Sequence, residues 1–191
     1  MISTLEAIKS INGGEIVVYP TDTVWGMGCD PMNQKAVDNL FKVKEKKKDG
    51  LSIMLGGLKD VEKYCEVNRK IKAACEGFLP GPLTLILKSK IKFARGVERE
   101  GTIGIRVPAN STALELASKG PVITTSANIH QGKIVKTLDE AKRLFGSKCK
   151  YLDGEKPEGI ESTIIDFTNR QPEIRRIGAL YSSILEGLIE F

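Results

Sequence analysis

Tyr19-Pro20-Thr21-Asp22-Thr23-Val24-Trp25-Gly26-Met27-Gly28-Cys29-Asp30 is the stretch around which the rest of the chain is organised. A run of apolar and β-branched residues from Glu15 to Tyr19 enters it and predicts a strand that stops at Pro20. Two threonine hydroxyls follow at the strand exit, and the two glycines allow a close approach of the backbone. The segment alone fits a tight strand-to-helix corner as well as it fits a binding site for a small polar molecule.

Length and composition indicate one compact unit. The chain has 191 residues, 41% of them apolar, so we expect a single domain over residues 1–191. No apolar run could span a bilayer and no charged-then-apolar leader is present, so we expect a soluble cytoplasmic protein without membrane contact. Four widely spaced cysteines and one histidine predict free thiols rather than a zinc site, and we expect no metal-binding residues. The net charge of +5 suits a phosphate-bearing partner.

Hydrophobic spacing and capping residues predict the helices and strands. Helices are expected at 4–11, from Asn33 to about Lys46, at 58–65, 68–78 and 182–189, and after Thr112 and Thr137. Strands are expected at 15–19, 51–55, 83–87, 102–107, 122–125, 162–167 and 173–177, the last two as a hairpin, with an exposed charged loop or hairpin tip at 88–100. The elements interleave without strict β-α-β alternation, which favours an α/β fold with one mixed, twisted sheet and helices packed on it.

Five lysines crowd the end of the helix that begins at Asn33, namely Lys42, Lys44, Lys46, Lys47 and Lys48. Cations at a helix C-terminus offset the helix dipole, so a solvated basic helix end explains them. The five charges also repel one another, and an anionic ligand would relieve that repulsion. Both interpretations stay open at the level of sequence.

Hydroxyl and guanidinium groups recur at strand ends: Thr21, Thr23, Arg106, Thr124, Thr125, Ser126, Asn128, Ser162, Thr163, and Arg175 or Arg176. Buried polar groups cost free energy unless they are paired, so several of them together suggest a shared polar cavity. Taken singly, each threonine or serine also fits turn chemistry or strand propensity, and Arg106 fits a salt bridge at a sheet edge.

The residue inventory argues against several kinds of site. His130 is the only histidine and no Gly-x-Ser-x-Gly elbow is present, which argues against nucleophilic hydrolysis. The Gly-x-x-x-x-Gly-Lys-Ser/Thr phosphate loop is also missing, and Gly26 and Gly28 lack a third glycine that opens a helix. Cations and hydroxyls without an obvious acid or base suit transfer at a phosphate, where positioning and charge neutralisation supply most of the catalysis.

Five motifs occur in order along the chain: Tyr19 to Gly28 as quoted, Pro80-Gly81-Pro82-Leu83-Thr84, Gly104-Ile105-Arg106-Val107-Pro108, Thr124-Thr125-Ser126-Ala127-Asn128 and Glu161-Ser162-Thr163-Ile164-Ile165-Asp166. Together they resemble the YrdC-type threonylcarbamoyl-adenylate synthases over about residues 5–180. The resemblance implies a YrdC-like twisted sheet with a large basic concave face. It also implies a nucleotidyltransferase activity. In the reaction that the resemblance implies, L-threonine and bicarbonate form a carbamate, which attacks the α-phosphorus of ATP and releases pyrophosphate.

The resemblance implies a role for nine side chains. Four would hold the threonine: Thr23, Arg106, Ser126 and Ser162. Five would contact the nucleotide, namely Lys44, Lys46, Thr102, Asn128 and Arg176, with the two lysines as catalytic groups on the phosphates. Arg106 suits the threonine carboxylate, because a guanidinium can grip both oxygens. The turn from Thr21 to Thr23 would then form one wall of the threonine pocket, and the two glycines would let the chain turn into the next helix.

Further ligands and partners follow from the same resemblance. It implies ATP as a substrate, Mg²⁺ as an assisting ion, and a product that feeds the tRNA modification N6-threonylcarbamoyladenosine at position 37. It also implies a functional link to a tRNA threonylcarbamoyl transferase, and it makes tRNA or double-stranded RNA a candidate ligand of the basic face.

The chain departs from the family pattern at three places. Lys46 stands where the family has an arginine followed by proline, Met54 where members often have a histidine, and residues 129–136 lack the usual small residues with Ser-Pro. Lysine keeps the charge of arginine but loses its planar fork. A competing hypothesis is therefore a binding module of the same fold that holds RNA without synthase activity.

Overall fold

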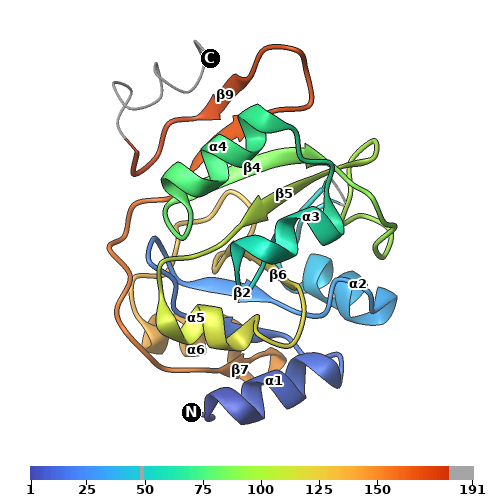
Figure 1. Ribbon diagram of the computed structural model, residues 1–191. Helices are drawn as coiled ribbons and strands as arrows, with labels where there is room; N and C mark the ends of the chain where they lie inside the picture. The colour runs from blue at the N-terminus through green and yellow to red at the C-terminus, as the bar shows by residue number, and fades with distance from the viewer. Residues whose placement is uncertain (48–49, 181–191) are drawn as a thin grey trace.

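The computed structural model of the chain describes residues 1–47 and 50–180, whose strands form one nine-stranded mixed sheet (Figure 1). The strands are β1 (Val17–Tyr19), β2 (Gly26–Gly28), β3 (Ser52–Met54), β4 (Leu83–Lys88), β5 (Thr102–Arg106), β6 (Val122–Ser126), β7 (Lys150–Tyr151), β8 (Thr163–Asp166) and β9 (Glu173–Arg176). Their order is β7-β1-β2-β6-β3-β5-β4-β8-β9. Three neighbouring pairs are parallel and five are antiparallel, so the predicted mixed α/β sheet and the β8–β9 hairpin are confirmed.

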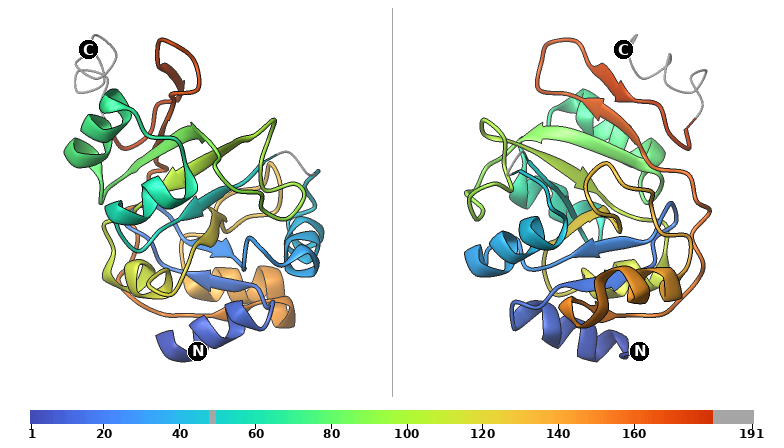
Figure 2. Two further views of the ribbon diagram at one scale, coloured as in Figure 1. Left: turned by 45° about the vertical axis from the view of Figure 1, so that its right-hand side comes forward. Right: turned by 180° about the vertical axis from the view of Figure 1, so that it is seen from behind.

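The helices lie on both sides of this sheet, which can be followed in two further views (Figure 2). They are α1 (Thr4–Asn12), α2 (Gln34–Val43), α3 (Val61–Tyr64) after a 3₁₀ turn at Leu58–Asp60, α4 (Arg69–Phe78), α5 (Ser111–Leu116) and α6 (Leu138–Phe145), which runs into a 3₁₀ turn at Gly146–Lys148. No helix in the described ranges is long and apolar enough to cross a membrane. The helix predicted at 182–189 lies outside the described residues.

Helix α2 begins as the sequence predicts and ends earlier. The Asn33 side chain accepts a hydrogen bond from the backbone N–H of Ala36, as an N-cap does. The helix stops at Val43, about three residues before the predicted end, and Glu45 then takes a positive φ of 52°. The lysines from Lys44 onward therefore lie in the loop that leaves the helix, and Lys48 lies outside the described residues.

Strand β1 places its side chains alternately in two apolar cores. Val17 and Tyr19 pack with buried residues of α1 and α5, whereas Val18 belongs to the larger core that includes α2 and α6. The Tyr19 hydroxyl donates a hydrogen bond to the carbonyl of Ile123 in β6, 2.9 Å away. The strand that leads into the Tyr19–Asp30 stretch is thus fixed on both faces before its exit turn begins.

Gly26 and Gly28 lie in a strand, which corrects the prediction that they turn the chain into α2. They flank Met27 in β2, between β1 and β6, and α2 begins only at Gln34. A Cβ atom on Gly28 would lie 1.7 Å from the Ile123 carbonyl oxygen, and one on Gly26 would lie 2.8 Å from the Tyr19 ring. Glycine is required here because neighbouring strands approach too closely for any side chain.

The charged segment 88–100 joins the antiparallel strands β4 and β5, so the predicted hairpin is confirmed, while the prediction that the segment is exposed is wrong for the part that is anchored to the core. Phe93, Ala94 and Val97 are buried and belong to the larger apolar core. The Val97 carbonyl also accepts a hydrogen bond from the backbone N–H of Leu51. Burial of these apolar side chains outweighs the charged character of the segment and holds it beside β3.

Candidate functional site

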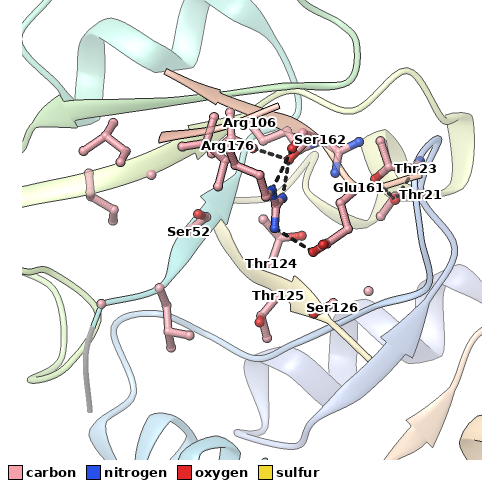
Figure 3. Close-up of a pocket in the computed structure, with 18 of the residues that line it drawn as sticks. Thr21, Thr23, Ser52, Arg106, Thr124, Thr125, Ser126, Glu161, Ser162 and Arg176 are labelled. Atoms are coloured by element: carbon pink, nitrogen blue, oxygen red, sulfur yellow. Dashed lines mark hydrogen bonds and ion pairs between the residues drawn. The ribbon is translucent and has the colours of Figure 1, made fainter. Parts of the chain in front are cut away.

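A polar cavity of about 380 Å³ opens where several strands of the sheet begin or end (Figure 3). Its polar lining comes from parts of the chain that are far apart in sequence: Thr21, Thr23, Lys46, Ser52, Thr84, Arg99, Thr102, Arg106, Thr124, Thr125, Ser126, Glu161, Ser162 and Arg176. A volume of a few hundred Å³ is typical of sites for small ligands. The predicted shared polar cavity therefore exists, with hydroxyl groups and cations as its main polar groups.

The turn after β1 presents Thr23 to the cavity, and Thr21 holds the turn in shape. Thr21 Oγ1 accepts from the backbone N–H groups of Thr23 and Val24, each at 3.2 Å, and donates to the Val24 carbonyl at 2.7 Å. The two threonine hydroxyl oxygens are 3.1 Å apart, and both side chains are buried. Thr21 thus satisfies the backbone of the turn and leaves Thr23 fixed at the wall.

Arg106 lies at the end of β5, inside the sheet rather than at its edge, and pairs with Asp22. Its Nη2 lies 2.5 Å from Asp22 Oδ1, and both side chains are largely buried. Burial lowers the pKa of Arg106, and the Asp22 carboxylate opposes that shift. Within the described residues, Arg106 Nε and Asp22 Oδ2 have no hydrogen-bond partner. The guanidinium is therefore held in place with part of its donor capacity unused.

Arg176 joins Glu161 and Ser162 into one network at the cavity. Its Nη1 donates to Glu161 Oε1 at 2.6 Å, its Nε to the Ser162 carbonyl at 3.0 Å, and its Nη2 to Ser162 Oγ at 3.2 Å. Ser162 Oγ also lies 2.9 Å from Thr84 Oγ1. The network ties β4, β8 and β9 together, and Figure 3 shows its side chains gathered at the cavity.

The alternative between Arg175 and Arg176 is resolved by the alternation of side chains along β9. Arg176 lines the cavity, whereas Arg175 donates to Asp166 Oδ2 at 2.8 Å and also pairs with Glu173. Successive residues of a strand point to opposite faces, so only one of two adjacent arginines can reach the cavity.

Lys44 lies behind the cavity and not in its lining. Its Nζ donates to the Ser126 carbonyl at 2.6 Å, the Asn128 carbonyl at 2.9 Å and Asn128 Oδ1 at 3.0 Å. The side chain is 3% exposed, and burial lowers its pKa to about 8. Lys44 therefore fixes the end of β6 and the loop that follows it.

Ser126 and Asn128 lie at this end of β6 and differ in their access to the cavity. Ser126 lines it, and its hydroxyl donates to Asn128 Oδ1 at 2.8 Å. Asn128 does not line the cavity, because its amide donates instead to the Gly132 carbonyl at 2.9 Å. The asparagine thus shapes the rim through the loop that its amide closes.

Lys46 and Thr102 also line the cavity. Lys46 Nζ is 3.5 Å from the Gly50 carbonyl, a long contact that leaves the ammonium open to other partners. The Thr102 hydroxyl donates to the Arg99 carbonyl at 2.7 Å. Seven of the nine predicted site residues thus line one cavity, and the exceptions are Lys44 and Asn128.

Sequence reasoning missed four polar residues of the lining: Ser52, Thr84, Arg99 and Glu161. Glu161 stands beside Ser162 in one of the five motifs, so its position was available as a signal. Ser52 and Thr84 lie inside strands, where a hydroxyl fits strand propensity as readily as a site. In the described ranges, no group of three or more His, Cys, Asp or Glu side chains could hold a metal ion. The four cysteines are free and buried, as predicted.

The fold and the cavity define a class of α/β proteins that hold a small polar ligand between hydroxyls and guanidinium groups at strand ends. The sequence of the chain was also compared with models of known protein families. The chain belongs to the Sua5/YciO/YrdC family, whose model carries the description "Telomere recombination" and matches residues 9–178.

Relatives and solved structures support this membership. A protein of Methanocaldococcus jannaschii is 38% identical over 145 residues, which cover 75% of this chain and 69% of that protein. The threonylcarbamoyl-AMP synthase of Pyrococcus abyssi is 33% identical over 187 residues, covering 94% of this chain and 55% of the synthase. The crystal structure of P. abyssi Sua5 complexed with L-threonine superposes with a TM-score of 0.89 at 29% identity. It covers 99% of this chain, which spans 58% of that structure, so the chain corresponds to little more than half of these two proteins.

Proposed function

We propose that this protein is a threonylcarbamoyl-AMP synthase, which makes L-threonylcarbamoyladenylate and pyrophosphate from L-threonine, bicarbonate and ATP. The observation that carries the proposal is the superposition of nearly the whole chain on a Sua5 structure that contains L-threonine. Relatives that match over most of this chain are named for the same activity. The competing hypothesis of an RNA-binding module without synthase activity has no such support.

In the proposed reaction two bonds form in sequence. The threonine nitrogen bonds to the bicarbonate carbon, water leaves, and a carbamate results. A carbamate oxygen then attacks the α-phosphorus of ATP, and the bond to the pyrophosphate oxygen breaks. Because the substrate supplies the nucleophile, the protein has to orient both substrates and neutralise developing charge.

The cavity has suitable groups for the threonine. We assign its carboxylate to Arg106, whose guanidinium is buried and fixed by Asp22. The hydroxyls of Thr23, Ser126 and Ser162 line the same space and would meet the remaining polar groups. The turn from Thr21 to Thr23 then forms one wall of the threonine pocket, as the sequence predicts.

For the nucleotide we assign Lys46 to the phosphates and Thr102 and Arg176 to the rest of the molecule, since all three line the cavity. Lys44 and Asn128, assigned to the nucleotide from sequence, lie outside the lining. We propose that Lys44 positions Ser126 and Asn128 beside the nucleotide through its three hydrogen bonds.

Mg²⁺ enters the proposal as an ion carried by ATP, where it would neutralise charge on the phosphate oxygens. The described residues offer no cluster of three metal-ligating side chains, so phosphates and water would supply most of its ligands. The proposal further includes a cytoplasmic location, transfer of the product to adenosine 37 of tRNA by a partner transferase, and a basic face as the site of any direct RNA contact.

The test is release of pyrophosphate from ATP by the purified protein. We expect release that requires both L-threonine and bicarbonate, together with a product that has the mass of threonylcarbamoyl-AMP. Pyrophosphate release that continues when threonine is left out would overturn the proposal. Salt-sensitive RNA binding without ATP binding would favour the competing RNA-binding hypothesis.

A further inference from the structure

Glu161 is the one carboxylate among the described residues that line the cavity. It stands immediately before Ser162, and Figure 3 shows its side chain extending into the cavity toward Arg176 and Thr124. The side chain is 37% exposed, so a bound molecule can reach it. The role of this carboxylate is open, because the assignments above rest only on cations, hydroxyls and amides.

The contacts of Glu161 leave one of its oxygens available. Oε1 accepts the hydrogen bond from Arg176 Nη1 at 2.6 Å, while Oε2 has no hydrogen bond to any part of the chain that the structure describes. Arg176 is itself fixed by two hydrogen bonds to Ser162. The carboxylate is thus oriented through one oxygen and offers the other to the cavity.

The proposed reaction needs a group that accepts a proton. The amine of threonine is protonated at neutral pH, and an ammonium has no lone pair with which to attack carbon. Formation of the C–N bond to bicarbonate breaks one C–O bond of the bicarbonate, and that oxygen leaves as water. Counting atoms and charge, the ammonium and bicarbonate give the carbamate, one water and one proton, and this proton must be taken up.

The other titratable groups that line the cavity are cations: Lys46, Arg99, Arg106 and Arg176. Protonated cations cannot take up a further proton, and threonine and serine hydroxyls are very weak bases. His130 is not part of the lining, and Asp22 is buried against Arg106. By its chemistry and place, Glu161 is the group in the cavity that can act as the base.

The position of Glu161 also suits the assigned threonine pose. Arg106 and Arg176 line the same cavity as Glu161, and Arg176 holds Glu161 by a hydrogen bond. The carboxylate and amine of an amino acid share one carbon atom. In the proposed pose, a threonine held by Arg106 through its carboxylate has its amine a few ångströms from that guanidinium, inside the cavity that Glu161 also lines.

We propose that Glu161 is a further catalytic residue, which takes the proton from the threonine ammonium so that the amine can attack bicarbonate. Arg176 is a positioning residue for this step. The inference rests on the proposed function and deepens it, since it divides the reaction into a base-dependent half at the amine and a base-independent half at the phosphate.

The test separates these two halves with the Glu161→Gln variant, whose amide oxygen can still accept from Arg176 but cannot take a proton. Forward synthesis starts from threonine, bicarbonate and ATP, and we expect it to fall about 100-fold or more. The reverse half, ATP formation from threonylcarbamoyl-AMP and pyrophosphate, releases the carbamate without protonating the amine. We expect its rate to stay within about threefold of the unchanged protein.

The matched control is Glu158→Gln, which removes an exposed carboxylate three residues earlier in the same segment. We expect both rates to be unchanged in this variant. Forward synthesis by Glu161→Gln within threefold of the unchanged protein, or an equal loss in both directions, would overturn the inference. If the unchanged protein fails to release threonine-dependent pyrophosphate, the proposed function itself is wrong, so the two failures are distinguishable.

Discussion

Two regions contribute side chains to the same cavity and are held in different ways, and the second of them reaches the cavity through Lys46. The arginine wall consists of Arg106, Glu161, Ser162 and Arg176, and the α2 exit loop consists of residues 44–47. In the arginine wall, each guanidinium is bonded to a carboxylate, and Arg176 makes three hydrogen bonds in total. In the exit loop, the ammonium of Lys46 makes one long contact within the described residues, with the Gly50 carbonyl.

This difference suggests different roles for the arginine wall and the α2 exit loop in the proposed function. The arginine wall is ordered when the protein folds, so an amino acid that binds there meets groups already in place. The lysine in the exit loop has a flexible stem and a point charge, which tolerate a range of phosphate positions. We infer that the amino acid is recognised by geometry and the phosphates mainly by charge.

The largest effect is expected from Arg106→Ala, which breaks the arginine wall. Threonine affinity should fall about 100-fold or more, because the charge-assisted grip on the carboxylate is lost. The Asp22 carboxylate also becomes a buried charge without its partner, and the free energy of unfolding should drop by about 3–5 kcal/mol. Calorimetry with L-threonine and urea unfolding measure the two effects.

A double variant, Arg106→Ala with Asp22→Asn, separates binding from folding. It should recover part of the lost stability, because the unpaired charge is gone, and none of the threonine affinity. Threonine affinity within threefold of the unchanged protein in either variant would mean that Arg106 does not hold the substrate.

The next effect concerns Lys44→Met, which removes the buried anchor of the exit loop. Three hydrogen bonds to Ser126 and Asn128 are lost, and the free energy of unfolding at pH 7 should fall by about 1–3 kcal/mol. Urea unfolding measures this change. Methionine is similar to lysine in shape and carries no charge, so the loss of stability can be attributed to the ammonium group.

The pH dependence of this variant tests the burial of Lys44. Burial lowers the pKa of Lys44 from 10.5 to about 8, so between these values the unfolded chain binds a proton that the folded protein does not. The stability of the unchanged protein, measured relative to Lys44→Met, should therefore rise with pH over this range, by about 3 kcal/mol at most. A difference that stays constant or shrinks would contradict a buried lysine with a lowered pKa.

The smallest effect is expected from Lys46→Ala, which sharpens the contrast between geometry and charge. The KM for ATP should rise about tenfold, because one charge-assisted phosphate contact is lost, while threonine affinity should not change. Lys46→Arg should alter the KM by no more than about threefold if charge alone is needed. Steady-state kinetics of pyrophosphate release measure both variants.

Lys47→Ala is the control for this prediction, because Lys47 does not line the cavity. Its KM for ATP should match that of the unchanged protein. An equal rise for Lys46→Ala and Lys47→Ala would mean that the loop acts through its overall charge and not through one side chain.

Most elements of the fold could be predicted because their signals are local. Asn33 caps α2 through a contact three residues away, and the apolar run 83–87 forms β4 as its composition predicts. Strand β2 could not be predicted, because Gly-Met-Gly has no strand propensity and one of its two partner strands, β6, is distant in sequence. The two glycines of β2 are needed for its close packing against β1 and β6 and do not form a turn.

The candidate site could be predicted in part for the same reason. Thr23 and Arg106 were found because strand ends and motifs mark them. Two lysines of the same segment cannot be told apart by sequence, because the burial of Lys44 depends on oxygens of Ser126 and Asn128, more than eighty residues later. Glu161 was overlooked although it stands in one of the five motifs, because the predicted site was built from cations, hydroxyls and an amide.

The hydrogen bonds of Arg176 have a consequence for synthesis of the protein on the ribosome. The cavity draws its walls from segments spread between Thr21 and Arg176, and this arginine orients both Glu161 and Ser162. Chains fold while they emerge, with N-terminal parts first. A nascent chain that ends before residue 176 therefore has most of the sheet, but Glu161 and Ser162 gain their hydrogen bonds to Arg176 only after β9 has been added.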